Sequence, residues 1–318
     1  MPVSNLHQGV VAGASGGSSY AIDNSAMFNI ADTEYLVFSN GGTPSNTDIG
    51  TISFWFKRGQ LGANRSNDQC VFGHGTGGSV KLQMNLSGGT GTNGDTIIVG
   101  NGHATRTSAK FRDTHAWYHI VIRVDTSQST SSDRQRIYIN GEVASLGSAS
   151  YPSQNADIFG TDPWEIAKYT GNTVNGYDGY IAEFCYCDGQ SLAPTAFGET
   201  DDNGVWKPID PTSNTFGNNG FYLNMAASGS DLGDDASGNS NDFTNTNSAT
   251  QTTDSPTNNY AVMTPLHSDA GTYSAGNTTA VTNSTDGAQL IGSMAFDSED
   301  SNGYYFIVRP TTTSSTIG

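Results

Sequence analysis

Short apolar runs, separated by turns rich in glycine and asparagine, most limit how this chain can fold. Residues 80–86, Val-Lys-Leu-Gln-Met-Asn-Leu, alternate apolar and polar side chains, as a strand with one buried face does. Residues 117–125 and 134–143 form the strongest pair of runs, and the second contains Asn140-Gly141, a hairpin signal. Helical patterns are absent, apart from one short turn at 191–198. The sequence therefore predicts an all-β fold, a mostly antiparallel sandwich or barrel.

Further strands are expected where β-branched and aromatic residues cluster between turn signals. They lie at residues 35–38, 51–57, 70–72, 96–99, 165–167, 179–186, 220–225 and 303–308. The Ser-, Thr- and Asn-rich residues 226–290 have few apolar anchors, so we expect them to wrap a neighbouring surface rather than build a core.

Charge and composition divide the chain into three parts. From Pro208 to Gly318 the only Lys or Arg is Arg309, against eleven Asp and Glu, which suggests a boundary near Trp206. Residues 1–25 are rich in Gly, Ser, Ala and Asn and are predicted to form a flexible or partner-ordered arm. The predicted parts are this arm, a β-domain at 26–200 and an acidic, loop-rich region at 201–318.

The overall charge and the cysteine count exclude several classes of protein. Thirteen Lys and Arg against thirty Asp and Glu give a net charge of −17, which argues against nucleic-acid binding because phosphate contacts need clustered basic side chains. No apolar run approaches the ~18 residues of a membrane helix, and the N-terminus lacks a signal-peptide pattern, so membrane insertion is not expected. Cys70, Cys185 and Cys187 are too few for a disulfide framework and are expected to be reduced, partly buried thiols.

Four segments occur in the order that is typical of one known type of β-domain. They are an aromatic strand at 51–58, Trp-Tyr-His-Ile-Val at 117–121, a Tyr-Ile-Asn-Gly hairpin at 136–142 and a closing Asp-Gly-Tyr-Ile-Ala-Glu strand at 177–184. This series resembles the concanavalin A-like, laminin-G-type domain over roughly residues 28–190. The resemblance implies an antiparallel jelly-roll sandwich followed by the extended C-terminal region.

The segments after this match resemble a narrower group. They lie at 197–201, 204–208, 220–223, 234–243 and 254–260. They are similar to structural proteins of tailed phages, especially marine and cyanobacterial ones, in which a laminin-G-like domain precedes such a segment. The resemblance implies a virion protein, a tail fibre or receptor-binding module on the tail, with the capsid surface as the second location. Its expected partners are other virion proteins, a host cell-surface glycan and further copies of the chain, because fibres are commonly trimeric.

Enzymatic activity is not expected. Retaining glycosidases need two carboxylates about 5 Å apart, which one branch of this fold places on a single strand with Glu-x-Asp-x-(x)-Glu spacing. That motif is missing, Glu165 and Glu183 stand alone among apolar neighbours, and there is no Gly-x-Ser-x-Gly elbow. The alternative functions are a capsid decoration or tail adaptor protein, and a polysaccharide depolymerase.

One acidic loop could bind calcium, although no cofactor is expected to be required. Residues 234–242 place oxygen ligands at alternate positions around a glycine, and the candidate ligands are Asp234, Asp235, Asn239, Asn241 and Asp242. The glutamate that closes an EF-hand loop is missing. The alternative is a loop of Asx turns, in which the same side chains cap backbone groups.

Glycan binding would use aromatic side chains in turns beside polar groups. Trp164, Tyr169 and Tyr151 stand in such contexts, and Asp162 precedes Pro163 and Trp164, so these four residues form the predicted glycan site. The alternative for Trp164 is that it closes one end of the core. Trp55 and Trp117 lie mid-strand and are predicted to be buried, and His119 is expected to be a core or cross-strand partner.

Overall fold

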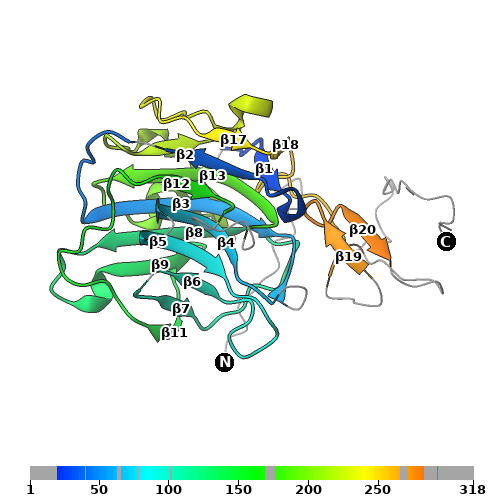
Figure 1. The fold of residues 1–318 in the computed structure, drawn as a ribbon, viewed down its shortest axis with the longest axis horizontal. Helices are drawn as coiled ribbons and strands as arrows, with labels where there is room; N and C mark the ends of the chain where they lie inside the picture. Colours follow the sequence, from blue (N-terminus) through cyan, green and yellow to red (C-terminus); the bar gives the residue numbers. More distant parts are fainter. Residues whose placement is uncertain are drawn as a thin grey trace.

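The chain folds into two eight-stranded antiparallel sheets that pack face to face (Figure 1). The computed structural model describes residues 20–39, 41–62, 66–76, 79–100, 102–168, 176–265, 271–282 and 292. Each strand predicted within these ranges is found, which confirms the all-β antiparallel sandwich, and the predicted strand at 303–308 lies outside them. Within the same ranges, no helix is both long and apolar enough to cross a membrane.

The first sheet, sheet A, has the order β10-β9-β8-β3-β13-β1-β18, with β16 beside the second half of β13. Its strands are β1 (Ser25–Phe28), β3 (Ile49–Arg58), β8 (Tyr118–Asp125), β9 (Gln135–Ile139), β10 (Glu142–Val143), β13 (Gly179–Asp188), β16 (Phe221–Leu223) and β18 (Thr250–Thr252). The predicted hairpin at Asn140-Gly141 joins β9 to β10, and both residues have the positive φ that such a turn requires.

The second sheet, sheet B, has the order β11-β7-β6-β5-β4-β12-β2-β17. Its strands are β2 (Tyr35–Phe38), β4 (Gln69–Thr76), β5 (Ser79–Leu86), β6 (Ile97–Val99), β7 (Thr105–Thr107), β11 (Leu146–Ala149), β12 (Trp164–Ile166) and β17 (Thr244–Thr246). Two small ladders stand apart, β14 (Gly198–Thr200) with β15 (Trp206–Pro208) and β19 (Gly271–Ser274) with β20 (Thr279–Thr282).

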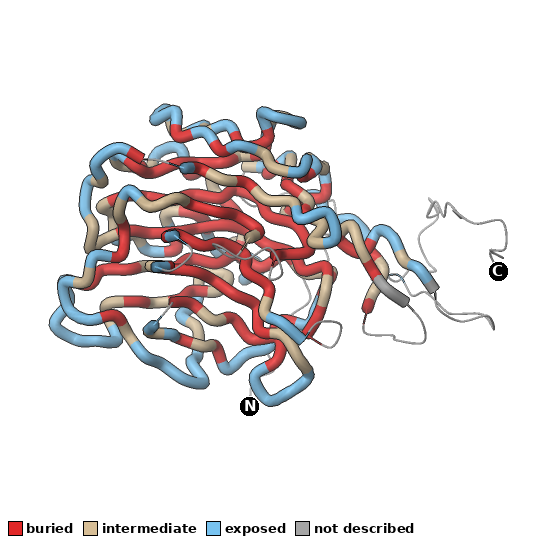
Figure 2. Tube along the Cα trace, in the orientation of Figure 1, coloured by how far each residue is buried: buried red, intermediate tan, exposed pale blue. Residues whose placement is uncertain are grey.

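Alternation along the strands builds the core between the sheets. On β3, Phe54 and Phe56 point inward, and Phe54 stacks on Phe184 of β13 with ring centroids 4.9 Å apart. Figure 2 shows the burial running along the strands of both sheets, while the exposed residues gather in the connecting loops. Aromatic residues at these inward positions bury large apolar areas, which accounts for most of the driving force for folding.

Described residues between 197 and 222 cover part of the outer face of sheet A. Phe216 and Tyr222 pack on Cys185 and Cys187, which are free buried thiols as expected. Trp206 packs in a second outer cluster, whose other members include Trp55 and Trp117. The two mid-strand tryptophans are therefore buried as predicted, but beneath the C-terminal region rather than between the sheets.

The C-terminal region also extends the sheets themselves. Strand β16 pairs with β13, while β17 and β18 form edges of sheets B and A, so the part of the expected wrapping segment up to residue 252 lies along the sandwich. The change in composition near Trp206 does not coincide with a break in this packing. Of the predicted N-terminal arm, residues 1–19 lie outside the described ranges, whereas Ser25 already begins β1.

The β19–β20 hairpin is joined to the sandwich through its turn (Figure 1, orange). The Asn277 amide donates to the carbonyl of Gly59 at 2.6 Å, and the Tyr180 hydroxyl donates to the carbonyl of Gly276 at 3.0 Å. Val281 on β20 is 60% exposed. An isolated two-stranded hairpin is marginally stable in water, so these turn contacts help to hold it.

One end of the sandwich is closed by a buried ion pair. The guanidinium of Arg58, at the end of β3, donates to Asp95 at 2.9 Å and to the carbonyl of Phe111 at 2.7 Å. Asp95 also accepts hydrogen bonds from the Gly62 amide and from Arg112. Burial opposes ionisation of Asp95, but these donors outweigh it and hold the pKa of its carboxyl below the usual value.

Removing Asp95 should therefore cost much more than removing an exposed partner. Asp95→Ala leaves the Arg58 charge buried and unpaired, and we expect it to lower the free energy of unfolding by about 3–5 kcal/mol. Asp133→Ala breaks the half-exposed pair with Arg136 and should cost about 1 kcal/mol or less. Urea unfolding of both variants measures the two losses, and equal losses would contradict this account.

Candidate functional site

Sheet A carries a polar pair under the C-terminal region that resembles a nucleophile and its base. The Ser53 hydroxyl of β3 lies 2.9 Å from Nε2 of His119 on β8, and the His119 ring lies against Trp55. Trp206 of β15 donates its indole N–H to Nδ1 of His119 at 3.0 Å. His119 is thus a buried cross-strand partner, as its position on a strand suggested.

The polarity of these hydrogen bonds excludes a base role for His119 toward Ser53 in this arrangement. Indole nitrogen can only donate, so Nδ1 is the acceptor and the ring hydrogen sits on Nε2. Nε2 therefore donates to the Ser53 oxygen instead of accepting its proton. Burial also lowers the pKa of His119 to about 3, which keeps the ring neutral.

A strained glutamate lies beside this pair. Strand β13 bulges between Ala182 and Cys185, and Glu183 takes a left-handed conformation with φ of 52°. The hydroxyls of Tyr222 and Tyr20 donate to Glu183 Oε2 at 2.7 and 3.0 Å. Burial raises the pKa of Glu183 to about 7, although both tyrosine hydrogen bonds oppose the rise. The bulge places an extra residue on the outer face, which is how a carboxylate comes to lie among apolar neighbours.

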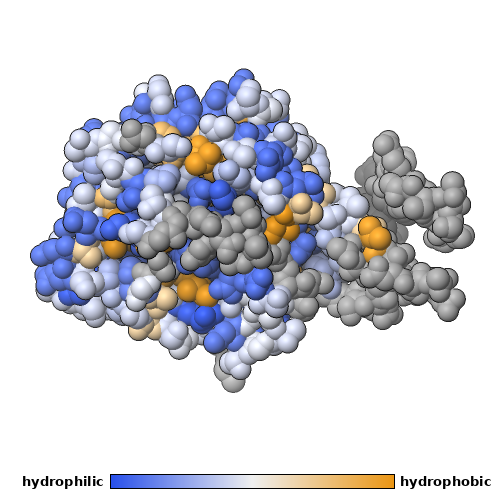
Figure 3. All heavy atoms as spheres, viewed as in Figure 1, coloured by the Kyte–Doolittle hydropathy of each residue, from blue (hydrophilic) through white to orange (hydrophobic). Residues whose placement is uncertain are grey.

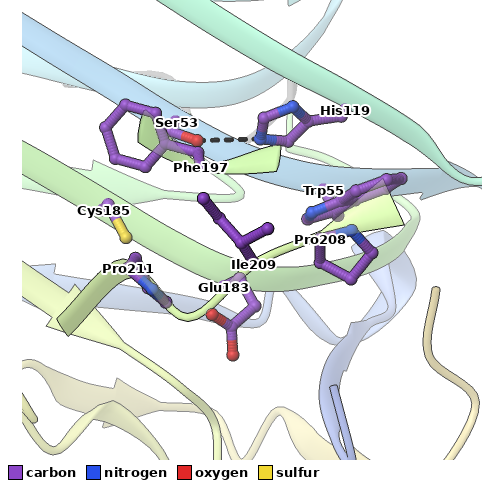
Figure 4. A pocket seen from close by; sticks show the side chains of 9 residues that line it. All are labelled: Ser53, Trp55, His119, Glu183, Cys185, Phe197, Pro208, Ile209 and Pro211. Carbon is purple, nitrogen blue, oxygen red and sulfur yellow. Dashed lines mark hydrogen bonds between the residues drawn. The ribbon is translucent and has the colours of Figure 1, made fainter. Parts of the chain in front are cut away.

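The cavity between these groups is small. Its volume is about 10 Å³, which is room for about one water molecule and not for a sugar ring. Figure 4 shows the Ser53–His119 pair on one side and the Glu183 carboxylate directed away from it. Glu183 is the one carboxylate that lines this cavity, so the two-carboxylate arrangement of a glycosidase is not built here.

The structure does not assemble the predicted glycan site. Trp164 is 2% exposed and packs between the sheets against Tyr186 and His74, with ring centroids 4.6 and 4.5 Å apart. A ring buried on both faces cannot stack on a sugar, so the assignment of Trp164 to glycan binding is corrected to its alternative, a core residue. Tyr151 and Asp162 are half-buried, and no hydrogen bond between them is found; Tyr169 lies outside the described residues.

The predicted calcium loop is held by hydrogen bonds instead. Asp235 accepts from the amides of Tyr222, Ser237 and Asn241, at 2.8 to 2.9 Å. The Asn239 and Asn241 amides both donate to the carbonyl of Gly220, which fastens the loop to the segment before β16.

These contacts fit the Asx-turn alternative better than calcium ligation. The carboxylate oxygens of Asp235 already accept backbone hydrogen bonds, and Asp242 accepts one from the Asp235 amide. Asp234 is exposed. Across the described part of the chain, no group of three or more His, Cys, Asp or Glu side chains is placed to hold a metal ion.

A second loop, residues 253–260, forms a rigid turn over the outer face of sheet A. Ser255 and Asn258 exchange backbone hydrogen bonds at 3.1 and 3.2 Å. The Asp254 carboxylate accepts from Lys57 at 2.7 Å and from the Tyr260 amide at 3.3 Å. Lys57 also donates to the Tyr260 carbonyl at 3.1 Å, so the turn is fixed from below by a buried lysine.

This turn presents an exposed aromatic ring, which sequence reasoning missed. Tyr260 is 46% exposed and is the aromatic residue among the large hydrophobic side chains that are exposed in the described ranges. Its hydroxyl lies 2.9 Å from that of Thr253 and accepts from Asn258 at 3.2 Å. The signal that selected Tyr151 and Tyr169, an aromatic residue beside a polar turn, also applies to Asn258-Asn259-Tyr260. An exposed ring flanked by amide and hydroxyl groups has the chemistry of a shallow sugar platform.

The sequence comparison places this architecture in a known family. A family profile described as the concanavalin A-like lectin/glucanases superfamily matches residues 31–189. The chain belongs to this superfamily. The match ends at β13, so the Tyr260 turn and the acidic loop lie outside the superfamily region.

Several solved structures are similar to this chain at low identity. A Bacteroides ovatus protein with a provisional carbohydrate-binding description is 18% identical, with a TM-score of 0.47, and the alignment covers 73% of this chain and 60% of that one. Domain 4 of the arabinanase AbnA from Geobacillus stearothermophilus, solved with arabinotriose, is 19% identical, with a TM-score of 0.39 and coverage of 57% and 79%. The sialyllactose-bound CBM40 domain of a Ruminococcus gnavus sialidase is 13% identical, with a TM-score of 0.31 and coverage of 51% and 89%. No curated protein matches the chain.

Glu183 should make the stability of this superfamily member depend on pH. Because its folded pKa is raised from 4.5 to about 7, its stabilising contribution is complete below pH 4.5 and is lost as the pH rises to about 7. Relative to Glu183→Gln, the unmodified protein should therefore lose on the order of 3 kcal/mol of unfolding free energy across this range.

Urea unfolding of both proteins at several pH values between 4 and 8 measures this difference. The buried His74 and His119 titrate in both proteins, so their contributions cancel in the comparison. A difference between the two proteins that stays constant with pH would show that Glu183 does not titrate in this range.

Proposed function

We propose that the chain is a non-catalytic carbohydrate-binding module that holds glycan on the surface around Tyr260. The observation that carries this proposal is a half-exposed aromatic ring on a turn fixed by Lys57 and Asp254. Sugar rings stack on such faces while Asn, Thr and backbone groups bind their hydroxyls. Because the turn is held rigidly before any ligand arrives, little ordering entropy opposes binding.

The absence of catalysis is part of the proposal. The Ser53–His119 pair has the wrong hydrogen-bond polarity for a nucleophile and base, and its cavity has no room for a sugar. Glu183 is hydrogen-bonded to two tyrosines and lies among apolar side chains. These groups are better explained as parts of the packing between sheet A and the C-terminal region.

The negative net charge of the chain favours some classes of glycan ligand over others. The chain has a net charge of −17, and a polysaccharide with repeated carboxylates or sulfates would be repelled at moderate salt. We therefore propose a neutral glycan as the ligand. Figure 3 shows the visible face as largely hydrophilic, with small separated hydrophobic patches, which suits a polar ligand better than an extended apolar partner.

The proposed setting is the virion of a tailed phage, with the module in a tail fibre or receptor-binding protein. Support comes from the resemblance of residues 197–260 to phage structural proteins. The β19–β20 hairpin favours a second candidate, an adaptor or capsid decoration role, because its exposed Val281 offers a surface to a neighbouring virion protein.

Glycan binding can be tested by substituting the platform residue. Tyr260→Ala should weaken binding to the best ligand on a neutral-glycan array by about tenfold or more, because the stacking face is lost. Tyr260→Phe keeps the ring and should retain most of the binding. Tyr151→Ala is the matched control, since this tyrosine also lies in a loop but is not part of the platform.

Three outcomes would count against the proposal. If binding survives in Tyr260→Ala but is lost in Tyr151→Ala, the glycan site is the loop around Tyr151 that the sequence predicted and not the Tyr260 turn. If the protein binds no neutral glycan on the array, the proposed binding function is contradicted. Release of reducing sugar from host polysaccharide would contradict the non-catalytic role.

The setting needs an independent measurement. Immunogold electron microscopy of purified virions, with an antibody against residues 28–190, should place gold on the tail. Gold on the head would favour the decoration role, and no gold on any virion would contradict the phage setting while leaving the glycan platform open to its own test.

A further inference from the structure

A buried lysine lies in contact with a carboxamide and a carboxylate at the base of the Tyr260 turn. Lys57 of β3 is fully buried, and its Nζ lies 2.7 Å from Asp254 Oδ2 and 2.9 Å from Asn259 Oδ1. The three groups come from two segments about 200 residues apart in the chain. An amine, an amide and an acid held together away from water are the components of an amide-exchange reaction.

The carboxamide is held in a defined orientation. Asn259 Oδ1 accepts from Lys57, while Nδ2 donates to the backbone carbonyl of His115 at 2.9 Å and lies 3.3 Å from Nε2 of the His115 side chain. The amide carbon is bonded to Oδ1, so it lies one bond beyond the atom that the lysine nitrogen contacts. Reactants held in this way avoid much of the entropic cost of a bimolecular step.

Burial opposes the positive charge of Lys57, although its contacts favour that charge. Tyr180 lies against Lys57 with its ring centroid 5.1 Å from Nζ, and Trp117 donates to the Asp254 carboxylate at 3.3 Å. Burial lowers the pKa of Lys57, although the carboxylate of Asp254 opposes this change. Asp254 is the adjacent base that can take the proton when the amine becomes a nucleophile.

We propose that Lys57 and Asn259 form an intramolecular isopeptide bond, with Asp254 as the proton carrier. Nζ attacks Cγ of Asn259, and Asp254 takes a proton from Nζ as the new C–N bond forms. The bond from Cγ to Nδ2 then breaks, and the leaving nitrogen receives that proton and departs as ammonia. The amine and the carboxamide become a secondary amide and ammonia, so no oxidant, reductant or other reactant is needed.

Asn259 is a better acceptor than Asp254 for two reasons. An ionised carboxylate is a poor electrophile, and the Asp254 carboxylate accepts hydrogen bonds from Lys57, Trp117 and the Tyr260 amide. Departure of ammonia from the amide also drives the exchange forward. The resulting bond fixes the residue directly before Tyr260 to β3, and it closes a loop of about 200 residues that the unfolded chain could not then open.

Intact-mass spectrometry of the purified full chain tests the proposal directly. The expected mass is about 17 Da below that calculated from the sequence, because one ammonia is lost. Trypsin should fail to cleave after Lys57, and a branched peptide should join Lys57 to the segment that contains Asn259. Asn259→Ala should restore the calculated mass, whereas Asn258→Ala, an exposed neighbour in the same turn, should keep the deficit.

The other outcomes overturn the proposal. A folded full-length chain with its calculated mass shows that the contact is only an ion pair with a hydrogen bond. A deficit of about 18 Da indicates loss of water and moves the bond to Asp254. A 17 Da deficit with normal cleavage after Lys57 indicates a succinimide at an asparagine. The measurement on the unmodified sequence is decisive even if a variant fails to fold, and it does not depend on glycan binding.

Discussion

The position of Lys57 on the outer face of sheet A is the constraint on which the C-terminal half of the structure depends. A lysine removed from water costs several kcal/mol unless it meets an opposite charge and further acceptors. The sandwich itself does not supply them, and residues 254–260 do, with a carboxylate, an amide oxygen and a carbonyl. Once this segment is in place, it and the residues before it also shield Trp55 and Trp117, so the region after the superfamily match is part of the fold.

The strands that the sequence predicted most clearly carry runs of aromatic and β-branched residues. The strands β3, β8 and β13, which are central in sheet A, are examples. The edge strands β17 and β18 read Thr-Asn-Thr and Thr-Gln-Thr, carry no apolar alternation and were missed, since their pairing is dictated by β2 and β1. The bulge at Glu183 has no local signal either, because it arises where β13 changes partner from β1 to β16.

In the candidate site, too, the local sequence does not reveal which side chains are exposed. Trp164 and Tyr260 both stand beside turns, and the local sequence does not distinguish which ring faces water. Burial of Trp164 is decided by Tyr186 on the opposite sheet, whereas Tyr260 stays exposed because Lys57 and Asp254 hold its backbone rather than its ring. The acidic loop was ambiguous for a similar reason, since Asx turns and calcium loops use the same residues and differ only in whether backbone amides reach the oxygens.

A shallow platform has a consequence for how the protein would be used. One half-exposed ring buries little area, and a single site of this kind binds sugar weakly even when its turn is rigid. Several copies presented together raise the effective concentration at a glycan-coated surface by orders of magnitude without any new contact. The proposed glycan-binding role would therefore gain from assembly, and the proposed homo-oligomer and the proposed platform would then be parts of one mechanism. Attachment of the turn to β3 would serve that mechanism, because each platform would then keep its orientation within its own copy of the chain.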